Sequence, residues 1–375
     1  MSGIYIHIPF CKQACNYCDF HFSTSLGTKD ALVKSIEQEL ISRKDYLTDP
    51  IETIYFGGGT PSLLNQEEIE SLLATVRSNY EITSSPEITL EANPDDLNLT
   101  KLKELKKSGI NRLSIGIQSF REQDLTLMNR AHNSEEALSC VGDAQSLGFE
   151  NITIDLIYGV PNLSDDAWEA NLTKAIELNV PHISAYCLTI EEKTVFHKWQ
   201  SEKTISLPTD EDALGQFKMM QRSLRKAGYD QYEISNFGKP GNYAVHNSNY
   251  WKQKHYLGAG PSAHSFNGTS RSWNIRNNPR YIKAINTGLT YFEKEILSIE
   301  DQFNEYLMTG LRTSFGISLV TLREFSCFNE TSFLGIIEKW LDQKYVTTEN
   351  SIYKLSDSGK FISDAITSDL FLDKI

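Results

Sequence analysis

Short strand-like segments alternate with amphipathic helix-like segments through the first two-thirds of this 375-residue chain. The predicted strands, rich in Ile, Leu, Thr and Tyr, are 3–8, 52–56, 87–91, 112–117, 151–157, 182–187 and 229–234. The predicted helices between them are 30–43, 66–78, 134–147, 165–178 and 210–227. This repeated order predicts an α/β fold, in which a parallel sheet with helices outside forms a partial or complete barrel.

The carboxyl ends of the predicted strands carry the most informative residues. Ligands bind at those ends in parallel sheets. A cysteine-rich loop follows the first predicted strand, and Gly57-Gly58-Gly59 follows the second. Glu91 ends the third strand, Gln118 follows the fourth, and Asp155 lies near the end of the fifth. We therefore expect these residues to converge on one site.

Three of the six cysteines, Cys11, Cys15 and Cys18, fall within eight residues. Thiolates are the usual ligands of iron–sulfur clusters. Three ligands for four irons leave one iron open to a substrate or cofactor, so the loop predicts an open [4Fe–4S] cluster. Structural zinc, with His21 as a fourth ligand, is the alternative.

Charge and hydropathy exclude several classes of protein. The formal net charge is −13 and no run of five or more Lys or Arg occurs, so nucleic acid is not expected as a main partner. No apolar stretch reaches the roughly 20 residues that span a bilayer. The amino terminus lacks the basic lead and apolar segment of a secretion signal. We expect a cytoplasmic protein and leave open peripheral contact with the inner face of the membrane.

Composition changes after about residue 235, where Gly, Asn, Ser and aromatic residues become frequent. Further on, the sequence predicts helices at 298–313, 319–325 and 331–344, a hairpin of 345–348 with 351–355, and a last helix from Ser356. Helices followed by a hairpin are typical of winged-helix modules, and the low basic content favours a structural or lid role over DNA binding. We predict a core domain (1–235), a connecting segment (236–290) and a carboxyl-terminal domain (291–375).

The four-then-three cysteine spacing resembles the radical S-adenosylmethionine superfamily. In that superfamily the open iron binds the amino and carboxylate groups of S-adenosylmethionine. Electron transfer, from a donor such as flavodoxin or ferredoxin, then gives a 5′-deoxyadenosyl radical. The resemblance implies a partial (β/α)6-type barrel.

Six segments carry a closer resemblance: YIHIPFCKQACNYCDF, FGGGTPSLL, LEANPDDL, SIGIQSF, MNRAH and IDLIYGVP. Together they resemble the family of oxygen-independent coproporphyrinogen III oxidases (HemN) and HemW proteins, over nearly the whole chain. The resemblance implies that S-adenosylmethionine contacts Tyr5, Tyr17, Phe20, Gly58, Gly59, Thr60, Glu91, Gln118, Arg130 and Asp155. Within that set, Glu91 would face the ammonium group and Arg130 the carboxylate, while Gln118 and Asp155 would bond the ribose.

Two departures distinguish this chain from the oxidases. The oxidases carry a fourth cysteine two residues after the third, where this chain has Phe20. They also have a substantial extension before the cluster strand, whereas here a strand-like pattern begins at Gly3. Both features resemble HemW.

A third feature is the segment HNSNYW, residues 246–251. It resembles the HNxxYW motif of HemW proteins, which is associated with heme binding, and imidazole is a suitable axial ligand for heme iron. His246 is thus a candidate heme ligand, with His255 and His264 as competitors. The alternative is a structural role, in which His246 only orders the Asn-rich loop.

These features support three hypotheses. The first is a heme chaperone that binds heme near HNSNYW and delivers it to recipient hemoproteins at the membrane. The second is an enzyme that oxidatively decarboxylates coproporphyrinogen III to protoporphyrinogen IX. The third is a radical enzyme acting on an unrelated substrate. The sequence assigns no catalytic residue.

Overall fold

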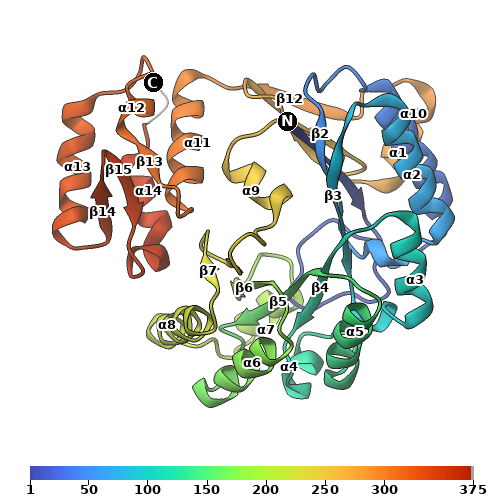
Figure 1. Ribbon diagram of the computed structural model, residues 1–375, viewed down its shortest axis with the longest axis horizontal. Helices are drawn as coiled ribbons and strands as arrows, with labels where there is room; N and C mark the ends of the chain where they lie inside the picture. The colour runs from blue at the N-terminus through green and yellow to red at the C-terminus, as the bar shows by residue number, and fades with distance from the viewer. Residues whose placement is uncertain (373–375) are drawn as a thin grey trace.

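The computed structural model describes residues 1–372, in which six parallel strands form the curved wall of a partial barrel (Figure 1). Neighbouring strands pair in parallel register in the order of the sequence. These strands are β1 (Ser2–Ile8), β2 (Ile51–Gly58), β3 (Ile82–Ala92), β4 (Arg112–Gln118), β5 (Asn151–Tyr158) and β6 (His182–Cys187). The first six predicted strands and the α/β fold are confirmed.

Helices cover the outer side of this wall (Figure 1). Asn65, Asn133 and Thr209 begin three of them with capping boxes, in which the cap side chain and the third helical residue bond each other's backbone N–H. The helices of this part are α1 (Lys29–Ser42), η1 (Pro61–Leu63), α2 (Gln66–Asn79), η2 (Pro94–Asp96), α3 (Leu99–Ser108), α4 (Glu122–Leu127), α5 (Ser134–Ser146), α6 (Asp165–Glu177), α7 (Val195–Ser201) and α8 (Asp210–Lys226).

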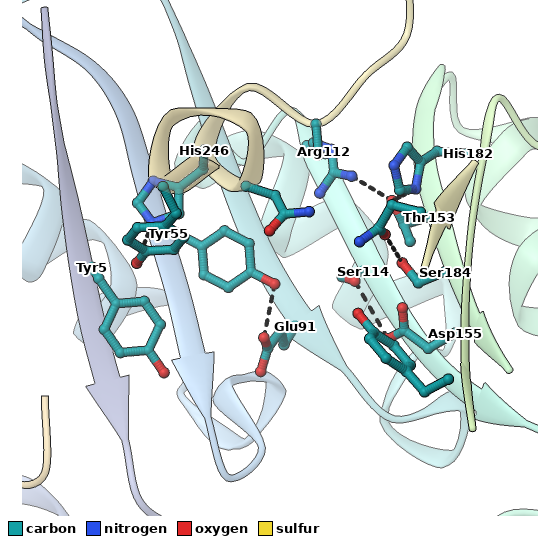
Figure 2. A pocket seen from close by; sticks show the side chains of 15 residues that line it. Tyr5, Tyr55, Glu91, Arg112, Ser114, Thr153, Asp155, His182, Ser184 and His246 are labelled. Carbon is teal, nitrogen blue, oxygen red and sulfur yellow. Dashed lines mark hydrogen bonds between the residues drawn. The ribbon is translucent and has the colours of Figure 1, made fainter. Parts of the chain in front are cut away.

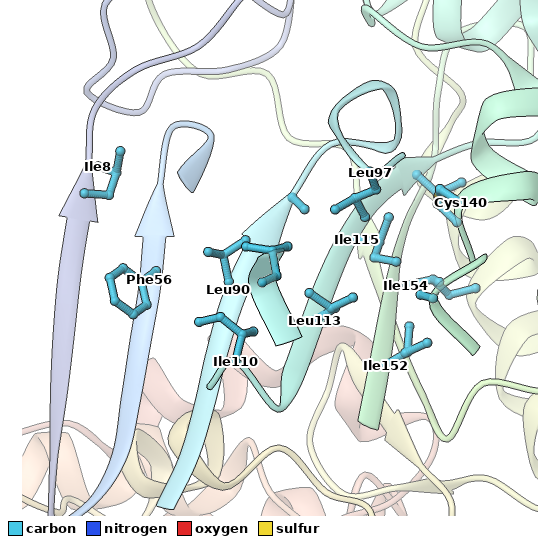
Figure 3. Close-up of a cluster of buried hydrophobic side chains, with 14 of the residues drawn as sticks. Ile8, Phe56, Leu90, Leu97, Ile110, Leu113, Ile115, Cys140, Ile152 and Ile154 are labelled. Carbon is cyan, nitrogen blue, oxygen red and sulfur yellow. The ribbon is translucent and has the colours of Figure 1, made fainter. Parts of the chain in front are cut away.

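The main core lies between the outer face of the strands and these helices. Figure 3 shows apolar side chains of successive strands, such as Phe56, Leu90 and Leu113, side by side in this layer. All three are fully buried. The residues between them, one position along each strand, point to the inner face, because side chains alternate across a sheet. Apolar and polar residues are therefore separated onto opposite faces of one wall.

The seventh predicted strand, 229–234, differs from the expectation. β7 (Asp230–Gln231) is two residues long and pairs antiparallel with β8 (Asn236–Gly238), which runs antiparallel to β6. The backbone beyond β7 bonds the carboxyl-terminal module instead: the amide of Ser314 donates to the carbonyl of Tyr232. The run of parallel strands therefore ends at β6, because these residues find other backbone partners.

The segment 236–290 extends the sheet on the other side of β1. β9 (Tyr256–Ala259) pairs parallel with β1, and short antiparallel strands continue from it. The further elements of the segment are α9 (Val245–Trp251), β10 (His264–Phe266), β11 (Ser270–Asn274) and α10 (Asn278–Thr287), and β12 (Phe292–Ile296) follows it and pairs with β11. Figure 1 shows α9 on the inner side of the wall. The sheet thus runs across residue 235, where composition changes.

The carboxyl-terminal module stands beside the opening of the wall (Figure 1) and has its own buried cluster, which includes Phe303, Ile337 and Tyr353. Its elements are α11 (Ile299–Leu311), β13 (Ile317–Ser318), α12 (Leu319–Leu322), α13 (Glu330–Asp342), β14 (Val346–Glu349), β15 (Ile352–Leu355), η3 (Gly359–Ile362) and α14 (Ser363–Leu370). The predicted helices and hairpin are confirmed in outline. Within residues 1–372, no helix has the length and apolar character needed to cross a membrane.

Candidate functional site

The cysteine loop is closed at its base by backbone pairing. The amide of Cys11 donates to the carbonyl of Ser23 at 3.1 Å, and the amide of Ser23 donates to the carbonyl of Pro9 at 2.9 Å. These bonds return the chain to its starting point after β1. The three cysteines are therefore held on one short loop at the carboxyl end of the first strand.

Side-chain amides fasten this loop to the segment that follows α4. Gln13 donates to the carbonyl of Asn129 at 2.9 Å, and Asn129 donates to the carbonyl of Ala14 at 2.7 Å. Asn129 adopts a left-handed backbone (φ 56°), which asparagine tolerates better than most residues. The chain therefore turns there and brings the next residue, Arg130, beside Cys15.

The guanidinium group of Arg130 is held by residues of the sheet side of the cavity and faces the cysteine loop. Nη1 donates to Sγ of Cys15 at 3.2 Å, while Nη2 donates to Asn93 Oδ1 at 2.6 Å and to the carbonyl of Gly116 at 2.7 Å. A Cβ on Gly116 would lie 3.3 Å from Nη2 and 2.9 Å from the side-chain nitrogen of Gln118. A larger residue at Gly116 would therefore displace the side chains of Arg130 and Gln118. Asn93, which lies in the LEANPDDL segment, was not among the predicted site residues.

The glycine run at the end of β2 packs tightly against β1 and the cysteine loop. Gly58 has a φ of 111°, which favours glycine, and a Cβ there would lie 2.6 Å from the His7 ring. A Cβ on Gly59 would lie 2.6 Å from the carbonyl oxygen of Phe10 and 3.0 Å from Sγ of Cys11. These glycines let backbone and cysteine loop approach each other closely.

Two acidic side chains lie on the inner face of the wall, Glu91 on β3 and Asp155 on β5. Burial raises the pKa of Glu91 to about 7, and Asp155 adds to the rise, while a hydrogen bond from Tyr55 at 2.7 Å opposes it. The amide of Gly58 donates to the other oxygen of Glu91 at 3.1 Å. Burial also raises the pKa of Asp155 to about 6. Near pH 7 a cationic partner would keep both carboxylates charged.

A cavity of about 480 Å³ brings most of the predicted residues together. Its lining includes Cys11, Cys15, Tyr17, Cys18, Phe20, Gly58, Gly59, Thr60, Glu91, Gln118, Arg130 and Asp155. The volume lies within the usual range for small-molecule sites. Tyr5 and His246 lie outside this lining, in the pocket behind it.

The three cysteine thiols line one cavity, which suits the ligand set of a cluster with one open iron. Among residues 1–372, no group of three or more His, Cys, Asp or Glu side chains is arranged to hold a single metal ion. Nε2 of His21, the zinc alternative's fourth ligand, is instead 2.7 Å from Asn278 Oδ1. A cubane offers each thiolate a separate iron, so three thiols spread around one cavity suit it. Burial raises the pKa of Cys18 to about 11, so metal binding there would release a proton.

Behind this cavity lies a narrower pocket of about 210 Å³, here called the inner pocket and drawn in Figure 2. Its floor contains polar residues that were not predicted, among them Arg112, Thr153 and His182. Arg112 donates to Thr153, whose hydroxyl lies 3.0 Å from Nδ1 of His182. The sequence does contain a signal for these residues, which is the alternation of polar and apolar residues along β4 and β5. Strands covered by helices on both faces are apolar throughout, so the alternation indicates a polar inner face.

His246 lies in the inner pocket with both ring nitrogens engaged. Nδ1 is 2.7 Å from the hydroxyl of Thr53, and Nε2 is 2.9 Å from the hydroxyl of Tyr250. The residue is 3% exposed. Burial lowers its pKa to about 3, helped by the charge of Arg112, so the ring is neutral. Ligation of iron by His246 would require one of these hydrogen bonds to break.

Comparison with known proteins places this chain in a family. The profile of the radical SAM superfamily matches residues 5–175. A protein of Bacillus subtilis named heme chaperone HemW is 32% identical, over 98% of each chain. Heme chaperone HemW of Escherichia coli is 32% identical, over 99% of this chain and 98% of its own. The chain belongs to the HemW family.

A solved structure agrees on the fold of this HemW family member. Coproporphyrinogen III oxidase (HemN) from Escherichia coli, described as a radical SAM enzyme, superposes with a TM-score of 0.85. The match covers 99% of this chain and 90% of that one, at 22% identity. It confirms the predicted radical SAM barrel with its carboxyl-terminal module. The radical SAM domain of this HemW family member implies a [4Fe–4S] cluster and S-adenosylmethionine.

Proposed function

We propose that this protein is a heme chaperone, which binds heme, a [4Fe–4S] cluster and S-adenosylmethionine and delivers heme to recipient hemoproteins, including those in membranes. The observation that carries the proposal is the similarity over 98% of both chains to a protein named heme chaperone HemW. Phe20 adds support, because it stands where the resemblance places a fourth cysteine in the oxidases.

Cys11, Cys15 and Cys18 would hold the cluster. When bound, cluster and S-adenosylmethionine together supply one-electron reductive cleavage of a sulfonium, with an electron from a donor such as flavodoxin or ferredoxin. The role of the protein is to fix the orientation of the cofactor before any chemistry occurs. This role does not depend on whether the sulfonium is cleaved during heme delivery.

The methionyl end of the cofactor would be oriented by two opposite charges. Glu91 presents a buried carboxylate to the ammonium group, and its oxygens are already positioned by Tyr55 and Gly58. Arg130 is held by Asn93 and Gly116, so its fork is fixed before a carboxylate arrives. The pKa of Glu91, raised by burial, would fall once the ammonium is in place.

The adenosyl end would be held by the remaining lining residues. Gln118 ends β4, Asp155 lies within the neighbouring strand β5, and both would bond the ribose hydroxyls. Gln118 has a left-handed backbone (φ 68°), a strained conformation that turns its side chain at the strand end. Tyr17 packs near Phe196, with ring centroids 6.5 Å apart, and would offer its ring to the adenine.

A heme titration of the full chain tests the proposal. Cluster-loaded protein is titrated with hemin, with and without S-adenosylmethionine, and followed by the heme absorption bands. We expect saturable binding, followed by transfer of the heme when an apo-hemoprotein such as apomyoglobin is added. Absence of saturable binding would refute the chaperone function.

The oxidase reaction is tested separately, because the fold is shared with HemN over 99% of this chain. The protein is incubated anaerobically with coproporphyrinogen III, S-adenosylmethionine and a strong reductant, and the tetrapyrroles are separated. We expect coproporphyrinogen III to remain. Formation of protoporphyrinogen IX would replace the chaperone by the enzyme.

A further inference from the structure

A second cavity of about 600 Å³, here called the outer cavity, lies between the short strands β9–β11 and α11 of the carboxyl-terminal module. It adjoins the cysteine loop. Phe20 of that loop lines both the outer cavity and the cavity of about 480 Å³ described above, here called the cofactor cavity. Its volume is within the range for cofactor-sized ligands. One wall of the outer cavity is formed by α11, and no site residue was predicted from the sequence on that helix.

The walls of the outer cavity suit a large flat apolar ligand. Trp251, Tyr256 and Phe266 contribute rings from one side. Across the cavity, Met308 is 37% exposed, and Phe20 at the loop is 67% exposed. Exposed large apolar side chains gathered around one cavity indicate a binding site. Aromatic rings in particular stack on conjugated ligands.

Three histidines line this cavity, and their hydrogen bonds distinguish them. His7 bonds the Tyr5 hydroxyl and the carbonyl of His21, each at 3.2 Å. His21 bonds Asn278 through Nε2. His264, in contrast, is exposed, and the described chain from 1 to 372 gives its ring nitrogens no hydrogen-bond partner. Its ring stacks on Trp273 with centroids 6.3 Å apart, which orients it.

Two guanidinium groups supply positive charge to the same cavity. Arg276 donates to the backbone carbonyl of Asp19 and has other donors left for an anion. Arg271 pairs with Glu305 at 2.9 Å, but its Nε is buried without a partner. Planar guanidinium forks match carboxylates well. The outer cavity therefore combines apolar walls, one free imidazole and donors for carboxylates.

We propose that the outer cavity is the heme site, with His264 as the axial ligand of the iron and Arg276 facing a propionate. This proposal rests on the proposed heme-chaperone function and locates its heme-binding site. In this proposal, the helix that carries HNSNYW does not supply the ligand of the heme iron. Tyr250 and Trp251 of that helix line the outer cavity, while His246, one turn before Tyr250, bonds Thr53 of β2 and the hydroxyl of Tyr250 and holds the helix in place.

The test compares histidine variants of the full chain in a hemin titration followed optically. We expect His264→Ala to shift the absorption band of bound heme and to weaken binding by about tenfold or more, because the iron loses its ligand. Added imidazole should restore the wild-type band in that variant. His246→Ala should keep the wild-type band. His255→Ala is the matched control, since His255 lies just before the same strands but does not line the cavity.

The outcomes separate the two proposals. If wild-type protein binds no heme, the chaperone function fails and this site fails with it. If wild-type protein binds heme and His264→Ala keeps both the band and the affinity, only the site is refuted. A lost band that imidazole does not restore, in a variant with an unchanged melting curve, also refutes His264 as the ligand.

Discussion

The inner pocket and the outer cavity flank the same helix, α9, and they treat histidine in opposite ways. In the inner pocket, His246 is 3% exposed and both of its ring nitrogens are hydrogen-bonded. In the outer cavity, His264 is exposed beside apolar rings and a guanidinium group. A buried polar group with all its partners stabilises the fold, whereas a free one is available to a ligand. The hydrogen-bond partners of a histidine, rather than its residue type or motif, therefore distinguish a structural role from a ligand-binding role.

The largest effect should come from the floor of the inner pocket. Arg112 lies 3.6 Å from Glu87, and both side chains are almost fully buried. Glu87 in turn accepts from the amides of Val245 and His246 at the start of α9. We expect Arg112→Met to lower the free energy of unfolding by about 3 kcal/mol or more, because Glu87 keeps a buried charge without its partner.

Urea unfolding measures this loss, and Arg225→Met is the control. Arg225 pairs with Asp357 on the surface, where both side chains are about half exposed. Such a pair contributes less than about 1 kcal/mol. Equal losses in the two variants would contradict the view that the inner pocket is a fixed network.

The second effect separates the two histidines directly. His246→Ala should lower the free energy of unfolding by about 2 to 4 kcal/mol, because it leaves a void and two buried hydroxyls without a partner. His264→Ala should change it by less than about 0.5 kcal/mol, as an exposed side chain does. Thermal melts of both variants check this. A large loss for His264→Ala would mean that its ring is part of the fold.

The third effect is a pH dependence of stability in protein without cofactors. Burial raises the pKa of Glu91 to about 7 and of Asp155 to about 6. Unfolded carboxyls lose their protons near pH 4, so the folded state binds more protons between about pH 4 and pH 7. The stability that these two carboxyls contribute is therefore greatest below that window and is lost as the pH rises through it.

Urea unfolding at pH 5 and pH 8 measures this dependence. Buried histidines such as His246, whose pKa burial lowers to about 3, act in the opposite direction, so the contribution of Glu91 is taken as the difference between wild type and Glu91→Gln. The change in the free energy of unfolding from pH 5 to pH 8 should be lower in wild type than in Glu91→Gln by on the order of 2 kcal/mol. The same change in both proteins would contradict the assignment.

The smallest effect concerns the rim of the outer cavity. Phe20 is 67% exposed, so Phe20→Ala should change the free energy of unfolding by less than about 0.5 kcal/mol. Heme affinity should nevertheless fall by about fivefold, the value of one aromatic contact. Val320→Ala is the control, since Val320 is 61% exposed and lies outside the lining of this cavity. An unchanged heme affinity in Phe20→Ala would remove the loop from the heme site.

The parallel wall could be predicted because local pattern decides it. Strands β1 to β6 carry regularly spaced apolar residues that must face the helices, as Leu90 and Leu113 do. The end of that order at β6 could not be predicted. The residues 229–234 have a strand composition, yet the carbonyl of Tyr232 bonds the amide of Ser314 in another module. A hydrogen-bond partner that is distant in the sequence cannot be recognised from the local pattern of residues.

The sites divide in the same way. Most of the predicted residues of the cofactor cavity could be named from motifs, and several of them, such as Glu91 and Gln118, lie at the end of a strand. The outer cavity could not, since Phe20, His264 and Met308 come from three distant segments. The motif at 246–251 was informative, but the task of its histidine depended on Thr53, which only the folded chain brings near.

The position of β1 has a consequence for synthesis of the protein. β1 pairs with β2 on one side and with β9, late in the chain, on the other. On a ribosome, the second edge of this strand stays open until residues 256–259 have emerged. Open edges are templates for wrong pairing, and contacts between distant segments form slowly. The nascent chain is therefore exposed to aggregation longest at the strand that leads into its cysteines, and a chaperone of nascent chains would protect it most by covering that edge.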